Sequence, residues 1–385
     1  MTPEEVREMV PLSRHEITEA DMEAVVAALR SGRLSQGERT CEFESAVARF
    51  VGAKYGVAVS SGTAALHLLM VALDLKPGDE VITTPFSYVA STNCIFYVGA
   101  RPVFVDIDET TLNLDPRLLG SVLSPRTKAI LPVHVFGRPC EMDEVLHFAQ
   151  AHDLRVVEDA CEALGSRYRG RAAGTIGLAG AFGFYPNKQI TTGEGGVIVT
   201  NDGAVAELCR SLRDQGRDPT GNSPKYLRLG YNYRMTELQA ALGLSQLRRL
   251  PALMGRRATV ASWYRESLAN VEELFLPAAP MPGIVMSWFA FAVCLRKEFT
   301  EEDRDRILAD LRSQGIGCGS YFPAIHLQSY IRERLPVQPG DYPVAERVAG
   351  RCLALPFASS LTQDEVAAVV AALLGCLARI PLHRR

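Results

Sequence analysis

The chain has 385 residues, with 41 basic and 44 acidic residues and a formal net charge of −3 at pH 7. This length exceeds one core of usual size, so we expect a large domain and a smaller one. The balanced charge argues against a nucleic-acid partner, and we find no apolar stretch long enough to span a membrane. Nine dispersed cysteines and seven histidines show no metal-ligand spacing and suit a reducing compartment. A cytoplasmic protein without a metal site is therefore expected.

Apolar runs typical of strands alternate with helical patterns through the first 200 residues. The alternation predicts an α/β fold, in which a mainly parallel sheet of about seven strands is flanked by helices. Ligands of such sheets bind beyond the carboxyl ends of the strands. The strand-like runs cover residues 57–59, 80–83, 102–106, 129–134, 154–158, 180–185 and 197–201.

The second half of the chain changes character after residue 235. Helical patterns cover residues 237–250 and 256–268, and shorter strand and helix patterns follow at 289–295, 301–314 and 362–377. Residues 215–230 form the one long irregular stretch, and loops of that size are usually functional or disordered. We therefore predict an N-terminal segment (1–35) that packs near the small domain, a large domain (36–265) and a smaller α+β domain (266–385).

A lysine lies in a Gly-rich turn after the strand at 180–185, in the run FYPNKQITTGEGG, where it is Lys188. Asp159 ends the strand at 154–158. Pyridoxal phosphate chemistry needs an amine for a Schiff base and a carboxylate for the pyridinium nitrogen. A lone lysine in such a turn is usually only solvated, and a lone Asp there is often a helix cap. Their combination favours an enzyme.

The segment SSGTA, residues 60–64, lies between a predicted strand and a predicted helix. Free N–H groups and the positive dipole end of a helix favour a dianion such as a phosphate at this position. Taken alone, the same pattern is more often a plain N-cap. The chain has neither a G-x-G-x-x-G motif nor a P-loop motif, so dinucleotide or nucleoside triphosphate binding has no motif support.

Seven motifs in order resemble the DegT/StrS family of pyridoxal phosphate-dependent nucleotide-sugar aminotransferases, which have the aspartate aminotransferase fold (type I). The similarity begins near residue 11 and extends into the C-terminal region. The motifs are SSGTAALHLL, ITTPFSYVAS, GARPVFVDID, LPVHVFGRP, VVEDACEALGS, FGFYPNKQITTGEGG and GYNYRMTELQAALGL.

The resemblance assigns the cofactor's reactive groups to residues of the large domain. It implies that Lys188 forms the Schiff base and that Asp159 pairs with the ring nitrogen. Tyr88 stands where an aromatic ring stacks on the pyridine. Glu162 stands where a Gln or His usually faces the phenolic oxygen.

The resemblance also implies a phosphate site and a substrate loop. Gly62 and Thr63 would hold the phosphate, and Asn232 would reach it from the other subunit of a homodimer. Tyr321 and His326 belong to a loop of the small domain that approaches the substrate in this family.

Two positions depart from the family pattern. Position 183 is Gly, whereas the family often has a Ser there that donates its hydroxyl to the phosphate. Backbone N–H groups or water must replace that contact. Glu162 replaces a neutral side chain with a potential anion, which would repel the cofactor's phenolate unless the carboxyl is protonated or turned away.

The implied function is transfer of an amino group from L-glutamate to a nucleotide-linked keto-deoxysugar. Such a reaction serves the biosynthesis of aminosugars, polysaccharides or glycosylated metabolites. Two alternatives stay open at this point. One is a pyridoxal phosphate-dependent sugar dehydratase, which replaces the lysine by His, and the other is a non-catalytic, cofactor-binding regulatory protein. The presence of Lys188, Asp159 and Tyr88 argues against both.

Overall fold

The centre of the molecule is a seven-stranded sheet, seen in a computed structural model that describes residues 10–218 and 225–380. The strand order is β1-β9-β8-β5-β4-β2-β3, in which β9 is antiparallel to both of its neighbours and the other pairs are parallel. The predicted α/β class is confirmed. The strands are β1 (Tyr55–Val59), β2 (Glu80–Thr83), β3 (Arg101–Phe104), β4 (Thr127–Ile130), β5 (Arg155–Asp159), β8 (Ala179–Gly183) and β9 (Gly196–Thr200).

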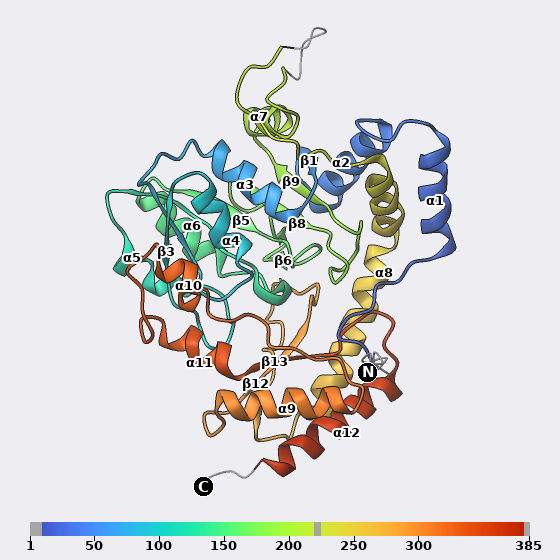
Figure 1. The fold of residues 1–385 in the computed structure, drawn as a ribbon, viewed down its shortest axis with the longest axis vertical. Helices are drawn as coiled ribbons and strands as arrows, with labels where there is room; N and C mark the ends of the chain where they lie inside the picture. Colours follow the sequence, from blue (N-terminus) through green and yellow to red (C-terminus); the bar gives the residue numbers. More distant parts are fainter. Residues whose placement is uncertain (1–9, 219–224, 381–385) are drawn as a thin grey trace, which may run out of the picture.

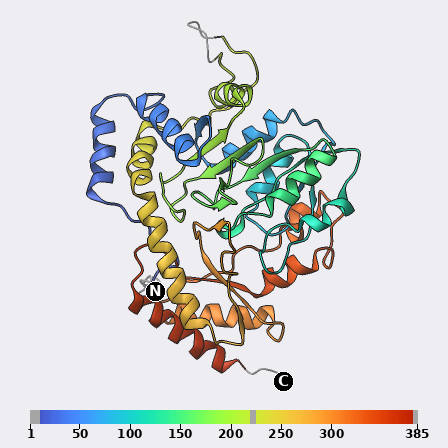
Figure 2. The ribbon, with the colours of Figure 1, turned by 180° about the vertical axis from the view of Figure 1, so that it is seen from behind.

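Helices cover both faces of this sheet (Figures 1 and 2). Along β9, Ile198 packs in one apolar cluster and Val197 and Val199 pack in another, as the two-residue period of a strand requires. The Ile198 face is covered by α3 (Gly62–Ala72), α4 (Ala90–Tyr97) and α7 (Gly203–Arg213), and the Val197 face by α2 (Glu38–Val51) and α8 (Glu237–Leu268).

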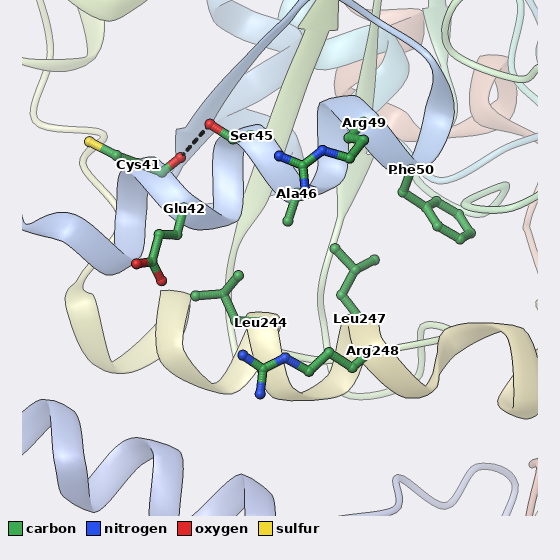
Figure 3. A pocket seen from close by; sticks show the side chains of 9 residues that line it. All are labelled: Cys41, Glu42, Ser45, Ala46, Arg49, Phe50, Leu244, Leu247 and Arg248. Carbon is green, nitrogen blue, oxygen red and sulfur yellow. Dashed lines mark hydrogen bonds between the residues drawn. The ribbon is translucent and has the colours of Figure 1, made fainter.

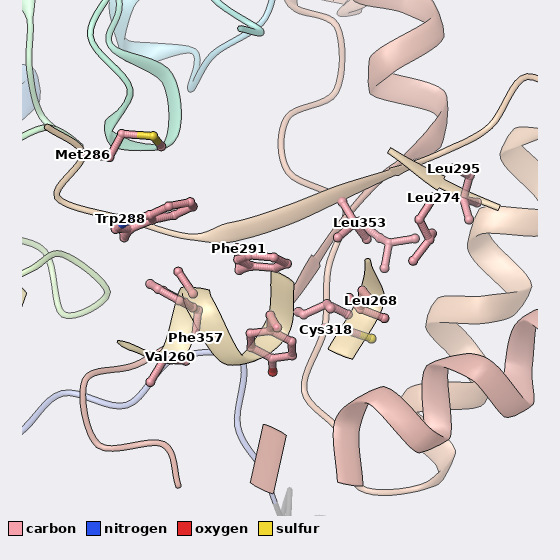
Figure 4. Packing of buried hydrophobic residues seen from close by; sticks show 14 of the residues in the cluster. Val260, Leu268, Leu274, Met286, Trp288, Phe291, Leu295, Cys318, Leu353 and Phe357 are labelled. Atoms are coloured by element: carbon pink, nitrogen blue, oxygen red, sulfur yellow. The ribbon is translucent and has the colours of Figure 1, made fainter. Parts of the chain in front are cut away.

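The C-terminal region forms a smaller α+β unit around an antiparallel sheet. Phe291 on that sheet stacks on Tyr264 and Phe357, with ring centroids 4.8 and 6.3 Å away, at the centre of the apolar cluster in Figure 4. The elements are β10 (Leu274–Phe275), β12 (Phe291–Leu295), β13 (Cys352–Leu355), α9 (Glu301–Ser313), α11 (Pro343–Arg351) and α12 (Gln363–Arg379).

The remaining elements are short or lie at the edges of these two units. The N-terminal stretch joins the C-terminal region, because the Phe357 N–H donates to Leu12 O at 2.9 Å and Val10 forms a bridge with Ile316. The remaining elements, in chain order, are α1 (Glu19–Arg30), η1 (Pro116–Leu118), α5 (Leu119–Val122), η2 (Val135–Gly137), α6 (Met142–Ala151), β6 (Arg167–Tyr168), β7 (Arg171–Ala172), β11 (Ile284–Val285), η3 (Ile325–Leu327) and α10 (Ser329–Arg332).

Helix α8 differs from the prediction of two helices, since it runs unbroken through Pro251 for 32 residues. A proline inside a helix loses one hydrogen bond and costs about 3 kcal/mol. Leu250 and Leu253 beside it are buried, and α1, α2 and α12 all pack along the helix. This burial offsets the cost. The helix also continues past residue 265, where the sequence predicts a domain boundary.

The predicted loop at 215–230 is an arm that extends from the body beyond α7 (Figure 1). Its two sides pair through an antiparallel bridge between Arg217 and Tyr226, while residues 219–224 lie outside the described residues. The arm therefore has a hairpin-like base rather than an irregular path.

The close packing of β8 on the turn before it can be tested by a substitution at Gly180. A Cβ at Gly180 would clash with the carbonyl oxygen and Cα of Gly174 and lie 2.7 Å from its carbonyl carbon. We expect Gly180→Ala to destabilise the protein by roughly 1–3 kcal/mol, because backbone atoms cannot move aside cheaply. Urea unfolding of the cofactor-free protein measures this.

Gly255→Ala, in helix α8, is the matched control for this substitution. A Cβ there meets nothing within 4 Å, so the change should be neutral or stabilise by up to about 1 kcal/mol. Equal stability of the two variants would contradict the described packing of β8.

Candidate active site

A cavity of about 600 Å³ lies at the carboxyl ends of the parallel strands. That position agrees with the expectation for ligand sites of such sheets. The cavity draws its lining from both halves of the chain and includes most of the residues singled out in the sequence. These are Gly62, Thr63, Tyr88, Asp159, Glu162, Lys188 and Tyr321.

Asp159 is fixed at the end of β5 by two hydrogen bonds. Its Oδ2 accepts from the Ser91 hydroxyl at 2.7 Å, and its Oδ1 accepts from the Cys161 N–H at 3.1 Å. Two donors on different oxygens fix the direction of the carboxyl group. Ser91 was not among the predicted site residues, although its place three residues after Tyr88 puts it in the same segment beyond β2.

Lys188 lies in the loop between β8 and β9, with its side chain 15% exposed. Its Nζ is 4.1 Å from the centre of the Phe289 ring and 3.4 Å from Glu162 Oε1. An ammonium above an aromatic face is attracted by the electrons of the ring. Phe289, which comes from the C-terminal half of the chain, was not among the predicted site residues. Its signal was weak, since a Phe before a strand is usually part of the core.

The first turn of α3 forms one wall of the cavity. Ser61 caps the helix by accepting from the Ala64 N–H at 3.0 Å. A Cβ at Gly62 would lie 2.9 Å from Cys161 Sγ, so this wall requires glycine. The first N–H groups of a helix have no partner within it and attract anions.

Glu162 lies on the floor of the cavity and is only 7% exposed. Its Oε2 accepts from the Phe136 N–H at 2.9 Å. Burial raises the pKa of this carboxyl, while the charge of Lys188 and the bond from Phe136 lower it. The sequence left two possibilities for this carboxyl, that it is protonated or that it is turned away from the cofactor. The side chain is not turned away from the cavity.

These groups fit pyridoxal phosphate. Residues that line this one cavity supply an amine for an aldehyde (Lys188), a fixed carboxylate for a ring nitrogen (Asp159) and a helix N-terminus for a phosphate (the first turn of α3). The cavity volume also falls in the range of small-molecule and cofactor sites, about 300–1,000 Å³.

Two aromatic side chains lie on different parts of the cavity wall. Tyr88 is 65% exposed, so its ring is free to meet a ligand. Tyr321 is partly buried, and burial raises the pKa of its hydroxyl.

His326 is not among the residues that line the cavity. It lies fully buried in η3, with Nε2 2.9 Å from Glu346 Oε1 and its ring against Tyr342. After Pro323 the chain leaves the cavity wall, and the Ile325 N–H bonds to Pro85 O at 2.8 Å. These contacts explain why His326 is buried although Tyr321, five residues before it, faces the cavity.

Asn232 is also outside this cavity, at the base of the arm, where it forms a bridge with Asp214. Its neighbours Tyr231 and Tyr233 stack on each other and pack against His67, with ring centroids 4.7 to 5.8 Å apart. Arg234 binds Asp214 at 2.7 Å, so it structures the base of the arm.

Another cavity, between α2 and α8, has a different chemistry (Figure 3). Its apolar lining includes Phe50, Leu244 and Leu247, and the hydrogen bond within it joins Ser45 to the Cys41 carbonyl of the same helix. None of the residues that line it pairs an amine with a buried carboxylate. The amine and the carboxylate expected for catalysis therefore identify the cavity at the strand ends as the candidate active site.

Arg257 is a supporting residue that the sequence analysis missed. It is 3% exposed, and its guanidinium donates to Trp288 O at 3.0 Å, to Phe289 O at 3.3 Å and to Lys188 O at 3.4 Å. Burial lowers its pKa to about 10, so it stays charged at neutral pH. Arg257 thus joins the backbone of Lys188 to the backbone of Phe289, whose ring contacts the Lys188 amine.

We expect Arg257→Gln to destabilise the protein by about 1–3 kcal/mol, because buried carbonyl oxygens lose their donors. The control is Arg256→Gln on the same helix, where the side chain is half exposed and binds Glu16. It should change stability by less than about 1 kcal/mol. Urea unfolding of both variants measures the difference, and equal values would contradict the contacts described for Arg257.

Comparison with known proteins agrees with this geometry. The model of the DegT/DnrJ/EryC1/StrS aminotransferase family matches residues 15–374. The GDP-perosamine synthase of Caulobacter vibrioides is 41% identical over 340 residues, which cover 88% of this chain and 90% of that protein.

Two solved structures extend the comparison to the fold. Helicobacter pylori PseC, an aminotransferase involved in the biosynthesis of pseudoaminic acid, has a TM-score of 0.92 at 29% identity, over 96% of this chain and 100% of its own. The PLP-form of the Streptococcus pneumoniae protein Spr1654 has a TM-score of 0.90 at 28% identity, over 95% and 98% of the two chains. The chain therefore belongs to the DegT/DnrJ/EryC1/StrS aminotransferase family and is a pyridoxal phosphate-dependent aminotransferase.

Proposed function

We propose that this enzyme transfers an amino group from L-glutamate to a nucleotide-linked keto-deoxysugar, with Lys188 and Asp159 as its catalytic residues. The observation that carries the proposal is the meeting of the Lys188 amine and the fixed Asp159 carboxylate in one cavity. The named relatives support the substrate class, since one is a GDP-perosamine synthase and another acts in the biosynthesis of pseudoaminic acid.

Asp159 has the role of keeping a ring nitrogen protonated. When bound, pyridoxal phosphate supplies an electron-accepting ring that stabilises the carbon from which a proton is removed. The Ser91 and Cys161 donors fix the position of the Asp159 carboxyl group, so its oxygens are placed to accept a hydrogen bond from a cationic N–H.

Lys188 has two roles in the proposal. Its Nζ would hold the cofactor through its aldehyde, and the same amine, when free, would take a proton from the α-carbon of the amino donor. The Phe289 ring and the Arg257 bond to the Lys188 carbonyl limit the positions that this amine can reach. A general base needs such positioning, because proton transfer requires hydrogen-bond distance.

Phosphate binding falls to Gly62 and Thr63 at the first turn of α3 in this proposal. The Ser61 hydroxyl uses its oxygen as the helix cap and keeps a proton to donate. Gly183 contributes no hydroxyl, although a Cβ there would lie 3.4 Å from Cys161 Cβ, an ordinary contact. Tyr88 would stack on the pyridine ring, and Tyr321 would contact the substrate.

We further propose a homodimer in which Asn232 completes the partner's phosphate site. The arm beside Asn232 exposes apolar side chains, among them Leu229 at 86% exposure, with Tyr226 and Leu227 also exposed. Exposed apolar groups that gather on a projecting segment are typical of an interface. Twofold dimers are also the commonest soluble oligomers.

The cytoplasm is the compartment that we propose. All nine cysteines are free, which suits reducing conditions. Among the described residues, no helix is both long enough and apolar enough to cross a membrane.

The role of Asp159 is tested by Asp159→Asn. Loss of the charge removes an interaction that stabilises the transition state, so bleaching of the cofactor's visible absorbance by L-glutamate should slow by about 10²–10³-fold. Cofactor affinity should fall by much less, since the other contacts remain. Stopped-flow absorbance and a cofactor titration give the two values. A loss confined to affinity would identify Asp159 as a binding residue only.

Shared active sites are tested by mixing two inactive proteins, Lys188→Ala and Asn232→Ala. In a mixed dimer, one site combines the intact Lys188 of one chain with the intact Asn232 of the other. Random exchange of subunits should therefore leave about a quarter of all active sites in the mixture with both residues intact, and activity should return in that proportion. Product formation from a panel of nucleotide keto-sugars, followed by mass spectrometry, measures the recovery.

The control mixes Lys188→Ala with Asp159→Asn, because both residues line the same cavity of one chain. This mixture should stay inactive. Inactivity of the first mixture, after light scattering and tagged-subunit capture have shown exchange, would mean that Asn232 serves its own chain's site or none.

A further inference from the structure

Glu162 is a buried carboxyl group beside the Lys188 amine, and its contacts fix its position. Its Oε1 is 3.4 Å from Lys188 Nζ, and its Oε2 accepts from the Phe136 N–H at 2.9 Å. Its own carbonyl oxygen also accepts from the Gln189 side chain. The carboxyl group is therefore held between the Phe136 N–H and the Lys188 amine.

The charged and titratable groups around Glu162 leave it one cationic partner. Lys188 faces it from the loop after β8, Asp159 and Cys161 from the end of β5, and Tyr321 from the C-terminal half of the chain. Of these, Lys188 alone is a cation. The charge state of Glu162 thus depends on whether the amine of Lys188 is protonated.

We propose that Glu162 is the proton acceptor of Lys188. The inference rests on the proposed function of Lys188, whose amine must be unprotonated before it can attack an aldehyde. In this step one N–H bond of the Lys188 ammonium breaks and its electron pair stays on Nζ. The proton forms an O–H bond with Glu162 Oε1. A cation and an anion become a neutral amine and a neutral acid, and no other reactant is needed.

Burial supports this direction of transfer. A desolvated site disfavours charged forms, and burial raises the pKa of Glu162 while the Lys188 charge lowers it. When Lys188 gives up its proton, the contribution that lowers the pKa of Glu162 disappears. The acid then holds its proton and stands as a neutral side chain, like the Gln or His expected at this position. Glu162 therefore need not repel a phenolate.

The experiment compares proton release on cofactor binding in the wild-type protein and in Glu162→Gln. Pyridoxal phosphate is titrated into each cofactor-free protein by calorimetry, in buffers of different ionisation enthalpy. In the variant no carboxylate at position 162 can take up the Lys188 proton, so wild type should release about one proton fewer per site. Glu194→Gln, a control with an exposed carboxylate at the cavity wall, should match the wild-type proton count.

The pH dependence gives a second readout. In the proposed step the pKa of Glu162 rises further when the Lys188 charge is lost, so above the pKa of the cofactor-free protein the complex holds one proton more and loses it as pH rises. Cofactor affinity of wild type should therefore fall across that range, and Glu162→Gln should not show this fall. Glu162→Ala, which also cannot accept a proton, serves if circular dichroism shows that the Gln variant misfolds.

The possible results distinguish the role of Glu162 from the proposed function of the enzyme. Equal proton release in wild type and variant, or the same fall in affinity with pH, would overturn the role of Glu162. Failure of wild-type protein to bind pyridoxal phosphate would instead contradict the proposed function, and would be seen before any variant is compared. A difference in proton count that vanishes in Lys188→Ala would show that Lys188 is the source of the proton.

Discussion

The parallel pairing of β5 with β8 is the constraint on which the site depends. It aligns Val157, Glu158 and Asp159 with Ala179, Gly180 and Ala181. Because the strands run in the same direction, Asp159 and the loop that carries Lys188 leave the sheet at the same edge. A slip of one residue would turn Asp159 to the opposite face. The close contact of Gly180 with Gly174 helps to fix the register.

The same register separates two adjacent carboxylates into different roles. Glu158 accepts from the N–H groups of Gly174, Ile176 and Gly177 and lies 2.9 Å from His134 Nε2. It holds the turn before β8 and does not reach the cavity. Asp159, one residue later, lies in the cavity wall. The glutamate thus stabilises the pairing that places the aspartate.

The strands, the ligand edge and the lysine turn could be predicted, because they follow from local apolar patterns and from motifs with distinct chemistry. The unbroken helix through Pro251 could not, since packing from α1, α2 and α12 overrides a local signal. Arg257 also gave no signal. A charged residue in a mixed helix is usually exposed, and only the fold reveals three carbonyl oxygens around it. His326 shows the same limit, since its direction is set by contacts with Glu346 and Tyr342.

Charge balance in the cavity gives the strongest physical argument for a site shared between chains. Among the described residues that line it, Lys188 is the one cation, whereas Asp159, Glu162 and Glu194 are acidic. The proposed ligands carry a phosphate, the carboxylates of glutamate and the diphosphate of a nucleotide sugar. The N-terminus of α3 can balance only part of this charge, because a helix end is equivalent to about half a unit charge. Proton transfer from Lys188 to Glu162 removes one anion but also the one cation. Further positive charge or hydrogen-bond donors must then come from outside this wall. In the homodimer that we propose, the arm of the second chain would bring the exposed residues Arg217, Lys225 and Arg228 beside the apolar residues that would seat it.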